Sequence, residues 1–401
     1  MVLHSPWRAD FPALSLFEAQ GQTYLDSAAT AQKPQALIDA LTGYYTSGVA
    51  NVHRAQHPPA ERVTRLYEAA RQRVAHWLNA ASPSQIVFTR GTTEALNLLA
   101  YGLEPLLSVG DEIVISALEH HANLLPWQQL AQRCQARLVI LPLDARGEIE
   151  LDAAARLIGP RTRILAVSQL SNVLGRWQPV DALVRLARAQ GAITVVDGAQ
   201  ASVHGRHDLQ ALGCDFYAFS AHKLYGPDGV GVLYGRADCL NQLRHWQFGG
   251  EMVRRADFHS ADFHAAPMGL EAGTPPIAGV IGLSATLDYL SGLNTQAVRE
   301  HEQALLEQLV AGLSVREGVR LLGEPQAALA SFVVDDVHHS DLAQLLGEQG
   351  IAVRGGNHCA MPLMQRLGVP GAIRVSLGLY NDGEDLARFF TALDQALEIL
   401  R

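Results

Sequence analysis

Lysine is nearly absent from this chain. Lys33 and Lys223 are the only two lysines, although Lys and Arg together number 31. Almost every side chain that only has to be positive is therefore Arg. Arg keeps its proton in a protein, whereas a Lys amine can lose its proton and act as a nucleophile. Lys223 lies between a Ser-Ala-His sequence and a glycine-rich turn in FSAHKLYGPDGVGVLYG, so we regard it as a candidate covalent lysine.

Cysteine is also scarce, and long apolar runs are missing. The four cysteines show no CxxC spacing and are too few for a disulfide framework, which favours a reducing, cytoplasmic setting. The N-terminus lacks a basic region followed by an apolar run of signal-peptide length. The most apolar later stretch, residues 275–287, is too short to span a bilayer. We therefore expect a soluble protein with no membrane partner.

An excess of positive charge is absent as well. The formal net charge is −9, so the chain lacks the excess of basic residues that is typical of proteins that bind nucleic acid. No internal repeat and no low-complexity segment is visible. The 401 residues, 48% of them apolar, can build a large core, either as two domains or as one large domain with a smaller satellite.

Short apolar runs recur between residues 60 and 240, and helical stretches such as VDALVRLARAQG separate most of them. Runs of this kind are typical of strands that are buried on both faces of a mostly parallel sheet. A Gly-Pro turn rather than a helix separates the last two runs, so we expect the final strand to be antiparallel. The predicted strands cover residues 86–88, 113–116, 138–141, 164–168, 193–196, 216–219 and 230–234.

The rhythm of the sequence changes after about residue 290. A long helical pattern over 294–314 precedes short apolar runs and a closing helix, GEDLARFFTALDQALEIL, which predicts a smaller α+β domain. We predict an α/β fold in which residues 22–290 form a large domain, and residues 1–21 with 291–401 form the small one. Ligands of open α/β sheets bind at the carboxyl ends of the strands, so the residues that follow each strand are the candidates for a site.

Polar residues follow the first two of these strands. Thr92 and Thr93 come after Gly91 at a helix start, where free N–H groups and hydroxyls either bind an anion or simply cap the helix. His120 and His121 follow the second strand. Adjacent histidines point in different directions, so both cannot easily serve one metal. One of them is expected to face the pocket as an acid, a base or a flat ring, and a polar loop is the alternative.

Two further strands end in groups that suit a heterocyclic aldehyde. Asp197, with Gln200 close behind it, ends a buried strand, where a carboxylate is costly unless it is paired. A protonated ring nitrogen is a suitable partner, and capping of the next helix is the alternative. Ser220 and His222 can donate hydrogen bonds to a phosphate while Lys223 reaches a carbonyl carbon. Together with the anion site, these residues are the groups that a protein supplies to bind pyridoxal 5'-phosphate, and no metal is expected.

The glycines after the candidate lysine do not form a dinucleotide-binding fingerprint. Gly229 and Gly231 lead into an apolar strand, and no helix opens after them. We therefore set aside a dinucleotide-binding dehydrogenase.

The stretch CDFYAFSAHKLYGPDGVGVLYG resembles the pyridoxal-phosphate attachment signature of class V aminotransferases. Other stretches are similar, in the same order, to the group II cysteine desulfurases, which include cysteine sulfinate desulfinases and selenocysteine lyase-like enzymes. These stretches are YLDSAATAQKP, ANVHRAQH, FTRGTTEALN, EHHANLLPW, SNVLG, VVDGAQ, LEAGTPP, IAVRGGNHCAMPLM and IRVSLGLYN. The resemblance spans nearly the whole chain. It implies fold type I of the pyridoxal-phosphate enzymes, with a mostly parallel seven-stranded sheet, and cysteine desulfurase activity.

Cys359, in RGGNHCAMP, is the cysteine to which the resemblance assigns chemistry. A loop thiolate near cations is more reactive than a thiol in a core. The resemblance implies that Cys359 attacks the sulfur of substrate cysteine and becomes a persulfide, with alanine as the other product. Cys134, Cys214 and Cys239 lie in helix or strand-edge contexts and are expected to be inert.

The resemblance also implies roles for other matching positions. Lys223 would hold the cofactor covalently and move protons, and His121 would stack on the cofactor ring and transfer protons. Arg374 would bind the substrate carboxylate in a bidentate pair, which Arg suits better than Lys. The remaining cofactor-binding roles fall on Thr92, Thr93, Asn172, Asp197, Gln200, Ser220, His222 and Thr274, and further substrate-binding roles on Asn172, Arg354 and His53.

The resemblance has implications for partners and pathway. Gly273 and Thr274 resemble a loop that completes the phosphate site of the neighbouring subunit, which implies a homodimer. The amide side chain at position 357 (Asn357) resembles the cysteine sulfinate desulfinase branch more than the branch dedicated to iron–sulfur cluster assembly under stress. Members of both branches pass persulfide sulfur to a small SufE-like acceptor protein. We therefore expect L-cysteine and related small molecules as substrates and such an acceptor as partner.

Two other interpretations remain open at this stage. The chain could catalyse another fold type I reaction, such as aminotransfer or kynureninase-like cleavage, and a keto acid rather than alanine would then be the product. It could also be a non-catalytic scaffold or sulfur-carrier subunit, which would stay colourless when pyridoxal phosphate is added.

Overall fold

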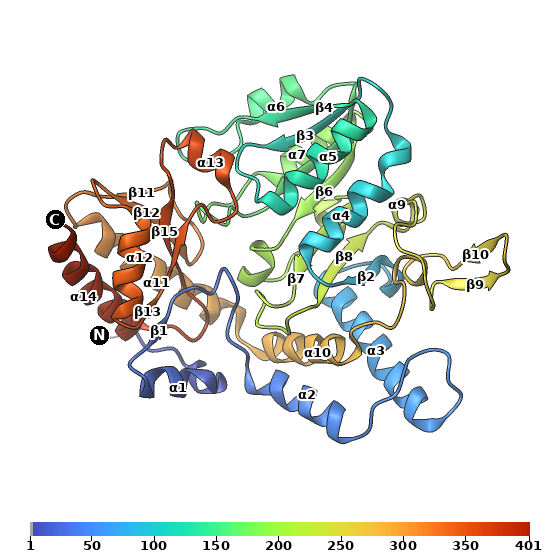
Figure 1. The fold of residues 1–401 in the computed structure, drawn as a ribbon, viewed down its shortest axis with the longest axis horizontal. Coiled ribbons are helices and arrows are strands. Elements are labelled where there is room, and N and C mark those ends of the chain that lie inside the picture. Colours follow the sequence, from blue (N-terminus) through green and yellow to red (C-terminus); the bar gives the residue numbers. More distant parts are fainter. Residues whose placement is uncertain (1–2) are drawn as a thin grey trace.

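The computed structural model describes residues 3–401, and its largest sheet has seven strands (Figure 1). They are β2 (Ile86–Thr89), β3 (Glu112–Ser116), β4 (Arg137–Leu141), β5 (Thr162–Ser168), β6 (Ile193–Asp197), β7 (Phe216–Ser220) and β8 (Gly231–Gly235). The spatial order is β2-β8-β7-β6-β5-β3-β4. Pairing is parallel from β4 through to β7, whereas β8 is antiparallel to both of its neighbours. All seven predicted strands and the antiparallel final strand are confirmed.

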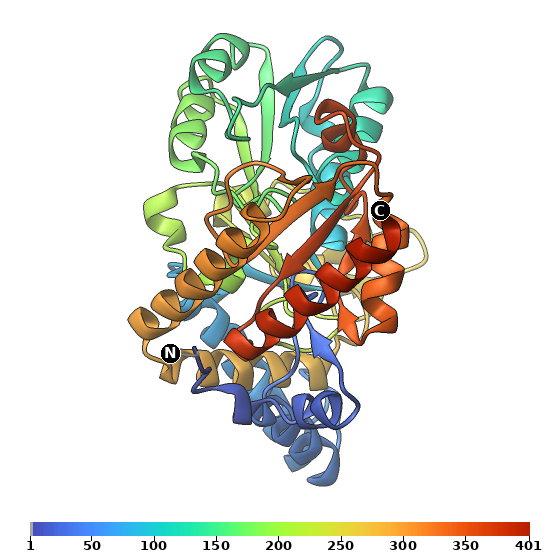
Figure 2. The same cartoon turned by 90° about the vertical axis from the view of Figure 1, so that its left-hand side faces the viewer.

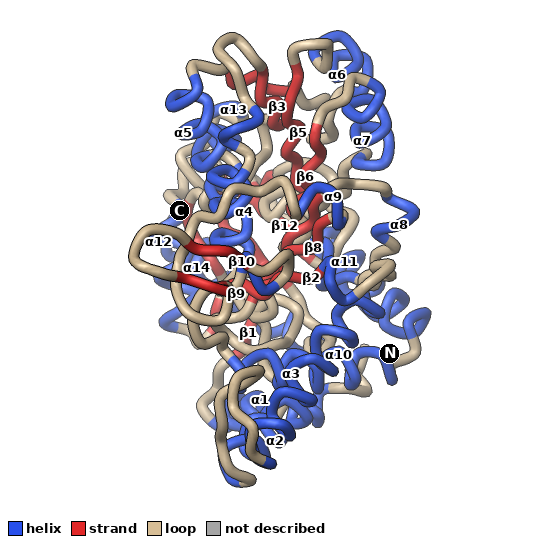
Figure 3. Tube along the Cα trace, turned by 90° about the vertical axis from the view of Figure 1, so that its right-hand side faces the viewer, coloured by secondary structure: helices blue, strands red, loops and turns tan. Residues whose placement is uncertain are grey.

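Alternate side chains of this sheet enter two different cores, because successive residues of a strand point to opposite faces. In β3, Ile113 and Ile115 pack with α4 (Thr92–Gly102) and α5 (Leu125–Cys134). Val114 packs on the other face with α6 (Leu151–Leu157), α7 (Val180–Ala189) and α8 (Leu209–Leu212). Figure 3 shows these two helical layers on either side of the sheet. Burial on both faces is why the strands are continuous apolar runs in the sequence.

A helical layer and a hairpin complete the part of the chain up to residue 292. The helices α2 (Gln35–Thr46), α3 (Pro58–Trp77) and α10 (Ile277–Gly292) pack together beside the sheet (Figure 1). The short helix α9 (Ala237–Leu240) leads toward a hairpin of β9 (Val253–Ala256) and β10 (Ala261–Phe263), which projects from the molecule (Figure 1).

A second sheet lies in the C-terminal part of the chain. It contains β11 (Val319–Leu321), β12 (Leu329–Val334), β15 (Ala372–Ser376) and β14 (Arg354–Gly356), in that order and all antiparallel. The helices α11 (Thr295–Ser314), α12 (His339–Glu348) and α14 (Gly383–Leu400) pack on it (Figure 2). The short helix α13 (Met361–Arg366) follows β14. The predicted helix over 294–314 and the closing helix are confirmed.

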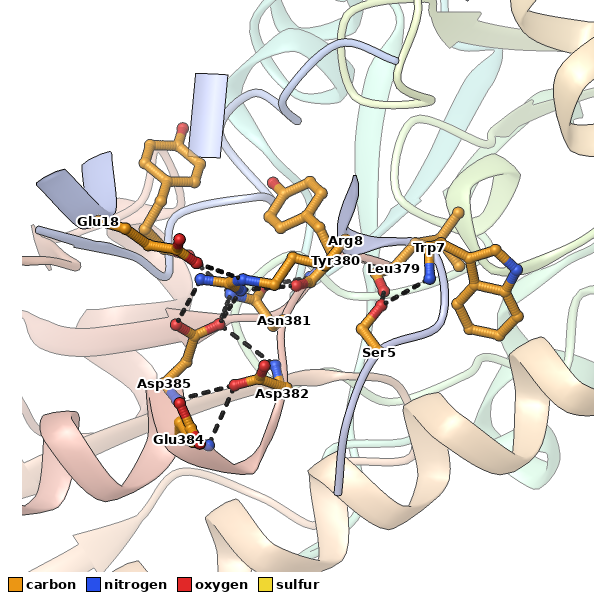
Figure 4. A network of polar contacts seen from close by, with 12 residues as sticks. Ser5, Trp7, Arg8, Glu18, Leu379, Tyr380, Asn381, Asp382, Glu384 and Asp385 are labelled. Carbon is orange, nitrogen blue, oxygen red and sulfur yellow. Dashed lines mark hydrogen bonds and ion pairs between the residues drawn. The ribbon is translucent and has the colours of Figure 1, made fainter. Parts of the chain in front are cut away.

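The N-terminal segment is attached to this C-terminal part. After α1 (Ala13–Ala19), strand β1 (Thr23–Tyr24) pairs in parallel with β13 (Ile351–Ala352). Arg8 forms an ion pair with Glu18 at 2.7 Å and another with the buried Asp385 at 2.9 Å, and it donates to the carbonyl oxygen of Tyr380 (Figure 4). These contacts support the predicted grouping of residues 1–21 with 291–401, and the division of the chain into those two domains stays a proposal.

Within residues 3–401, no helix has both the length and the apolar character that a membrane span requires. In the same range, no group of three or more His, Cys, Asp or Glu side chains is placed to hold a metal ion.

Candidate active site

A cavity of about 230 Å³ lies at the carboxyl ends of the central strands, against the C-terminal sheet. Most of the residues that the sequence singled out line it: Thr92, Thr93, Asn172, Asp197, Gln200, Ser220, His222, Lys223, Arg354, Cys359 and Arg374. They come from the ends of β2, β5, β6 and β7 and from two strands of the C-terminal sheet. The parallel arrangement explains this convergence, because it places the carboxyl ends of these strands at one edge. His53, His121 and Thr274 do not line the cavity.

One end of the cavity is built to receive an anion. The Oγ of Ser220 accepts a hydrogen bond from the backbone N–H of Thr92, and its hydroxyl lies 2.8 Å from that of Thr92. Thr92 is the first residue of α4, and Ser220, the last residue of β7, contacts it there. The first N–H groups of a helix have no partner within the helix and favour negative charge. A Cβ on Gly231 would overlap the backbone of Gly91, so these two glycines let β8 approach the α4 start closely.

Lys223 is a partly exposed residue that lines the cavity. Burial lowers the pKa of this amine to about 8; Asp197 opposes the change, and Arg374 adds to it. A substantial fraction of the amine is therefore neutral near physiological pH, which an ordinary lysine would not be. A neutral amine is what a nucleophilic lysine needs.

Asp197 is 5% exposed and lies at the end of β6. Its Oδ1 accepts the backbone N–H of Ala199, and no other hydrogen bond to this carboxylate is present among residues 3–401. Burial raises the pKa of Asp197, while the Ala199 N–H and the Lys223 amine oppose that shift. A buried carboxylate that lacks a full set of partners suits a cationic group in the cavity.

His120, rather than His121, lines the cavity. The Nδ1 of His120 accepts the N–H of Ala122, because His120 is the N-cap of the short 3-10 helix His121–Asn123. The neutral ring therefore carries its proton on Nε2. Burial, together with the charge of Lys223, lowers the pKa of His120 to about 3, so the ring is neutral. The sequence indicated that one of two histidines faces the pocket, and the structure gives that place to the first.

His121 instead supports the loop that carries Cys359. Its backbone N–H donates to the carbonyl oxygen of Cys359 at 2.7 Å, and its Nε2 accepts the N–H of Met361 at 3.3 Å. The predicted ring-stacking position is therefore not where His121 lies. The side chains of adjacent residues diverge at this turn, and the chain enters the 3-10 helix with the first ring toward the cavity.

The loop that carries Cys359 has an unusual backbone. His358 and Cys359 both have left-handed φ values, 51° and 55°. Such conformations cost about 1–3 kcal/mol for each residue that is not glycine, and they persist only where surrounding contacts hold them. The Oδ1 of Asn357 accepts the N–H of Cys359 at 3.0 Å, and the side-chain amide of Asn172 donates to the carbonyl oxygen of His358 at 2.8 Å. The thiol is thereby held at the cavity by two residues that follow strands of different sheets, Asn357 after β14 and Asn172 after β5.

The other three cysteines differ from Cys359 in environment. All four cysteines are free, and only Cys359 lines the cavity. Burial raises the pKa of the Cys134 thiol, that of Cys239 to about 12, and that of Cys214 further still. A raised pKa removes the reactive thiolate. This supports the expectation that these three thiols are inert.

Two arginines on neighbouring strands of the C-terminal sheet, Arg354 and Arg374, line the cavity, and Asp26 pairs with both. The guanidinium of Arg374 is buried; its Nη2 lies 3.1 Å from Oδ1 of Asp26, and its Nη1 donates to the carbonyl oxygen of Asn172. The Nε of Arg374 is buried and has no hydrogen-bond partner. Arg354 is half exposed and lies 3.6 Å from Oδ2 of Asp26. The sequence pattern gave no sign of a role for Asp26, although this residue lies inside the family-like stretch YLDSAATAQKP.

His53 and Thr274 lie outside the cavity of the single chain. His53 forms an ion pair with Glu68 at 2.9 Å, and this hydrogen bond raises the pKa of the histidine. Thr274 is exposed and follows Glu271, which is held by a buried, two-bond ion pair with Arg71. The structure of one chain thus places both residues away from Lys223.

These residues fit pyridoxal phosphate by the chemistry of their donors. Hydroxyls and a helix start occupy the anion end, a lysine of lowered pKa lies beside them, and Asp197 keeps an oxygen free for a protonated ring nitrogen. His120 supplies a neutral ring, and Gln200 is fixed by a hydrogen bond to the carbonyl oxygen of Ala28 at 2.9 Å. No residue of this set has to be replaced to hold the cofactor.

Comparison with known proteins agrees with this site. The family model described as Aminotransferase class-V matches residues 23–389. The chain is 69% identical over 401 residues to a probable cysteine desulfurase of Pseudomonas aeruginosa, with all of both chains covered. The crystal structure of the cysteine desulfurase CsdA from Escherichia coli superposes with a TM-score of 0.93 at 45% identity, covering 98% of each chain. An apo cysteine desulfurase structure from Thermococcus onnurineus gives a TM-score of 0.94 at 34% identity, covering 99% of each chain.

The chain therefore belongs to the class V aminotransferase family. Within that family it falls among the cysteine desulfurases, which are enzymes that depend on pyridoxal phosphate. The resemblance read from the sequence, the fold type and the cofactor are confirmed.

Proposed function

We propose that this chain converts L-cysteine to L-alanine and retains the sulfur as a persulfide on Cys359. One observation carries the proposal: Lys223 and Cys359 line the same cavity, together with Arg374. A lysine alone would suit many reactions of the family. A thiol in the same cavity as that lysine suits the transfer of sulfur.

The cofactor site follows from the donors already described. Lys223 would hold pyridoxal phosphate covalently, Thr92, Thr93, Ser220 and His222 would bind its phosphate, and Asp197 would pair with its ring nitrogen. Bound pyridoxal phosphate supplies an electron-withdrawing ring that weakens the bonds at Cα and Cβ of an attached amino acid. We assign the ring contact to His120 instead of His121, because His120 lines the cavity.

Arg374 would bind the substrate carboxylate. Its guanidinium is held in place by Asp26 and by the carbonyl oxygen of Asn172, while its buried Nε lacks a partner. A planar, fixed guanidinium is suited to a carboxylate because it can donate two parallel hydrogen bonds. This contact orients the substrate so that its sulfur faces Cys359.

Cys359 would then attack the sulfur of the substrate. A bond forms between Sγ of Cys359 and the substrate sulfur, the bond between that sulfur and Cβ breaks, and the electron pair leaves with Cβ. The sulfur is oxidised to the sulfane level while Cβ is reduced toward the methyl group of alanine, so no external oxidant is needed. The neutral Lys223 amine can take the Cα proton, and Nε2–H of His120 can donate a proton within the cavity.

We also propose a wider substrate range, a homodimer, a sulfur acceptor and a cytoplasmic location, each from a different observation. Activity on cysteine sulfinate and L-selenocysteine is supported by Asn357, at the position where the sequence resembles the desulfinase branch. A homodimer is supported by His53 and Thr274, which lie outside the cavity of one chain although they match active-site motifs. Transfer of sulfur to a SufE-like acceptor, for iron–sulfur clusters or other sulfur compounds, is supported by the partly exposed Cys359 and the 58% exposed Met361 beside it. We also propose a cytoplasmic location from the scarce, unpaired cysteines.

The proposed reaction is tested by product analysis. Purified protein loaded with pyridoxal phosphate is given L-cysteine and a thiol reductant, and alanine, sulfide and keto acids are measured. We expect alanine and sulfide in equal amounts from wild type and from the Cys239→Ala control, and almost none from Cys359→Ala. A keto acid in place of alanine, or full activity of Cys359→Ala on cysteine, would overturn the proposal.

A further inference from the structure

Asp26 binds both arginines of the cavity. Its Oδ1 lies 3.1 Å from Nη2 of Arg374, and its Oδ2 lies 3.6 Å from Nη1 of Arg354. The Asp26 side chain is 17% exposed, that of Arg374 is 4% exposed, and that of Arg354 is 48% exposed. Asp26 is thus a shared counter-ion that lies behind the cavity wall, while the two cations face the substrate.

The backbone keeps Asp26 at this position. The N–H of Leu25 donates to the carbonyl oxygen of Ala352, two residues before Arg354. The N–H of Ser376, two residues after Arg374, donates to the carbonyl oxygen of Leu25 at 2.8 Å, and Asp26 itself forms a parallel bridge with Ser376. The aspartate is therefore fixed relative to both arginines by main-chain hydrogen bonds, and its carboxylate does not depend on side-chain flexibility to reach them.

The charges that face the cavity can be counted. The lining cations are Arg354, Arg374 and the partly protonated Lys223, and the lining anion is Asp197. Asp26 adds a second negative charge from behind the wall, in contact with both arginines. The histidines near the cavity add no charge. Burial is the largest cause that lowers the pKa of His120 and His358 to about 3 and that of His222 to about 4. Glu119, behind His120, is enclosed by hydrogen bonds from Ser168 and Asn123 and does not line the cavity.

The balance on the substrate side decides how many anions the cavity accepts. Asp197 would pair with the ring nitrogen of the cofactor. Arg354, Arg374 and Asp26 therefore set the charge at the place where the substrate would bind. Two guanidiniums and one carboxylate leave a single positive charge. L-cysteine presents one carboxylate and a neutral thiol, whereas cysteine sulfinate presents a second anion at the reacting sulfur. A low-dielectric cavity makes an unmatched charge costly.

We propose that Asp26 is a specificity-determining residue that favours L-cysteine, with one carboxylate and a neutral thiol, over cysteine sulfinate, which carries a second anion. Asp26 offsets one of the two positive charges that Arg354 and Arg374 carry together, so the pair attracts a second anion less than two free guanidiniums would. The unpartnered Nε of Arg374 stays available to the α-carboxylate. This inference rests on the proposed cysteine desulfurase function. In that function, Asp26 lowers the ratio of activity on cysteine sulfinate to activity on cysteine.

The first test measures kcat/KM for cysteine and for cysteine sulfinate in the loaded enzyme. For Asp26→Asn we expect the ratio of sulfinate to cysteine to rise about tenfold, because the pair of arginines gains a net charge. The ratio removes any loss that comes from a misplaced Arg374, since both substrates need that contact. Asp26→Glu keeps the charge and is expected to keep the wild-type ratio. An equal loss for both substrates in Asp26→Asn would mean a purely structural role and would overturn the proposal.

Asp394→Asn is the matched control. Asp394 also pairs with an arginine, Arg316, through two contacts of 2.6 and 2.7 Å, but it lies on α14 and does not line the cavity. We expect the wild-type ratio from this variant. If Asp26→Asn does not fold, Arg354→Gln provides the converse test, because its half-exposed side chain can be replaced without opening the core. Arg354→Gln is expected to lower the sulfinate-to-cysteine ratio, and an unchanged ratio would count against the proposal.

The second test needs neither substrate nor cofactor turnover. Cys359 is alkylated with iodoacetate, which is anionic, and with iodoacetamide, which is neutral, and modification of its peptide is followed by mass spectrometry. Asp26→Asn should raise the rate with iodoacetate relative to iodoacetamide several-fold, whereas Asp394→Asn should not. A ratio that is the same in all three proteins would overturn the inference. Failure of the proposed function would be seen separately, as wild type that makes no alanine from cysteine.

Discussion

Nζ of Lys33 donates a hydrogen bond of 3.1 Å to the backbone carbonyl oxygen of His222, so one of the only two lysines of the chain contacts the residue that precedes the other. The N–H of Ala31 donates to the same oxygen at 3.0 Å. Lys33 also lies 3.7 Å from Asp228, whose side chain is 81% exposed. The peptide that precedes Lys223 is thus held from outside the cavity by the segment that follows Asp26.

We predict that Lys33→Met lowers kcat about five- to tenfold with little change in KM, because the amine of Lys223 loses part of its orientation. Asp228→Asn removes the weak ion partner of Lys33 but keeps its hydrogen bond, and it should behave as wild type. Steady-state kinetics on L-cysteine check both variants. Wild-type kcat in Lys33→Met would show that the lysine contact does not position Lys223.

The second prediction concerns the titration of Lys223. Burial disfavours the charged ammonium, so in the cofactor-free protein the amine loses its proton near pH 8 and not near its ordinary value. At pH 8 about half of the amine is neutral, against about 0.3% for an unperturbed lysine. Because the chain has only two lysines, competitive acetylation read by mass spectrometry resolves them. A midpoint above pH 10 for Lys223 would contradict the burial argument.

The third prediction concerns the buried Glu119. Burial raises its pKa to about 7, although Ser116, Ser168 and Asn123 donate hydrogen bonds to it. The folded protein therefore binds more protons than the unfolded chain between pH 4.5 and 7, and stability from this group falls as the pH rises through that window. Relative to wild type, Glu119→Gln should gain about 1–3 kcal/mol in unfolding free energy between pH 5 and pH 8.

Denaturant unfolding at both pH values measures that difference. Glu119→Leu serves as the control, because it leaves all the donors without an acceptor and should be destabilised at either pH. A difference between wild type and Glu119→Gln that does not vary with pH would mean that the carboxyl group is already ionised at pH 5.

The fourth prediction concerns the loop of Cys359. Asn357→Ala removes the acceptor for the N–H of Cys359 and should let the two left-handed residues relax, because their strain is no longer offset. We expect kcat for L-cysteine to fall about tenfold, with a much smaller change for cysteine sulfinate, which loses its β-substituent with less need for the thiol. Asn357→Ser can still accept two residues ahead and should restore most of the activity. Equal losses on both substrates would point to a change outside the thiol loop.

Local patterns accounted for the elements and for the covalent chemistry. The continuous apolar runs marked all seven strands of the central sheet. In the inner strands burial on both faces leaves no polar alternation, and the edge strand β4 is an apolar run although it is partly exposed. The Gly-Pro turn after Lys223 correctly indicated an antiparallel final strand. The residues at the strand ends, among them Asp197 and Lys223, could be grouped because parallel strands bring their carboxyl ends to one edge.

Pairs far apart in the sequence were decided only by the tertiary structure. Asp26 meets Arg374 across 348 residues, and no local periodicity encodes that contact. The choice between His120 and His121 depends on where a 3-10 helix begins, and one residue of shift turns the side chain away from the cavity. His53 and Thr274 match active-site motifs in the sequence, yet one chain places them elsewhere. The sequence by itself determined the strands and the reactive groups, because these depend on local burial patterns and side-chain chemistry. Only the packed fold decided which carboxylate meets the arginines and which histidine ring faces the cavity, because both depend on long-range pairing.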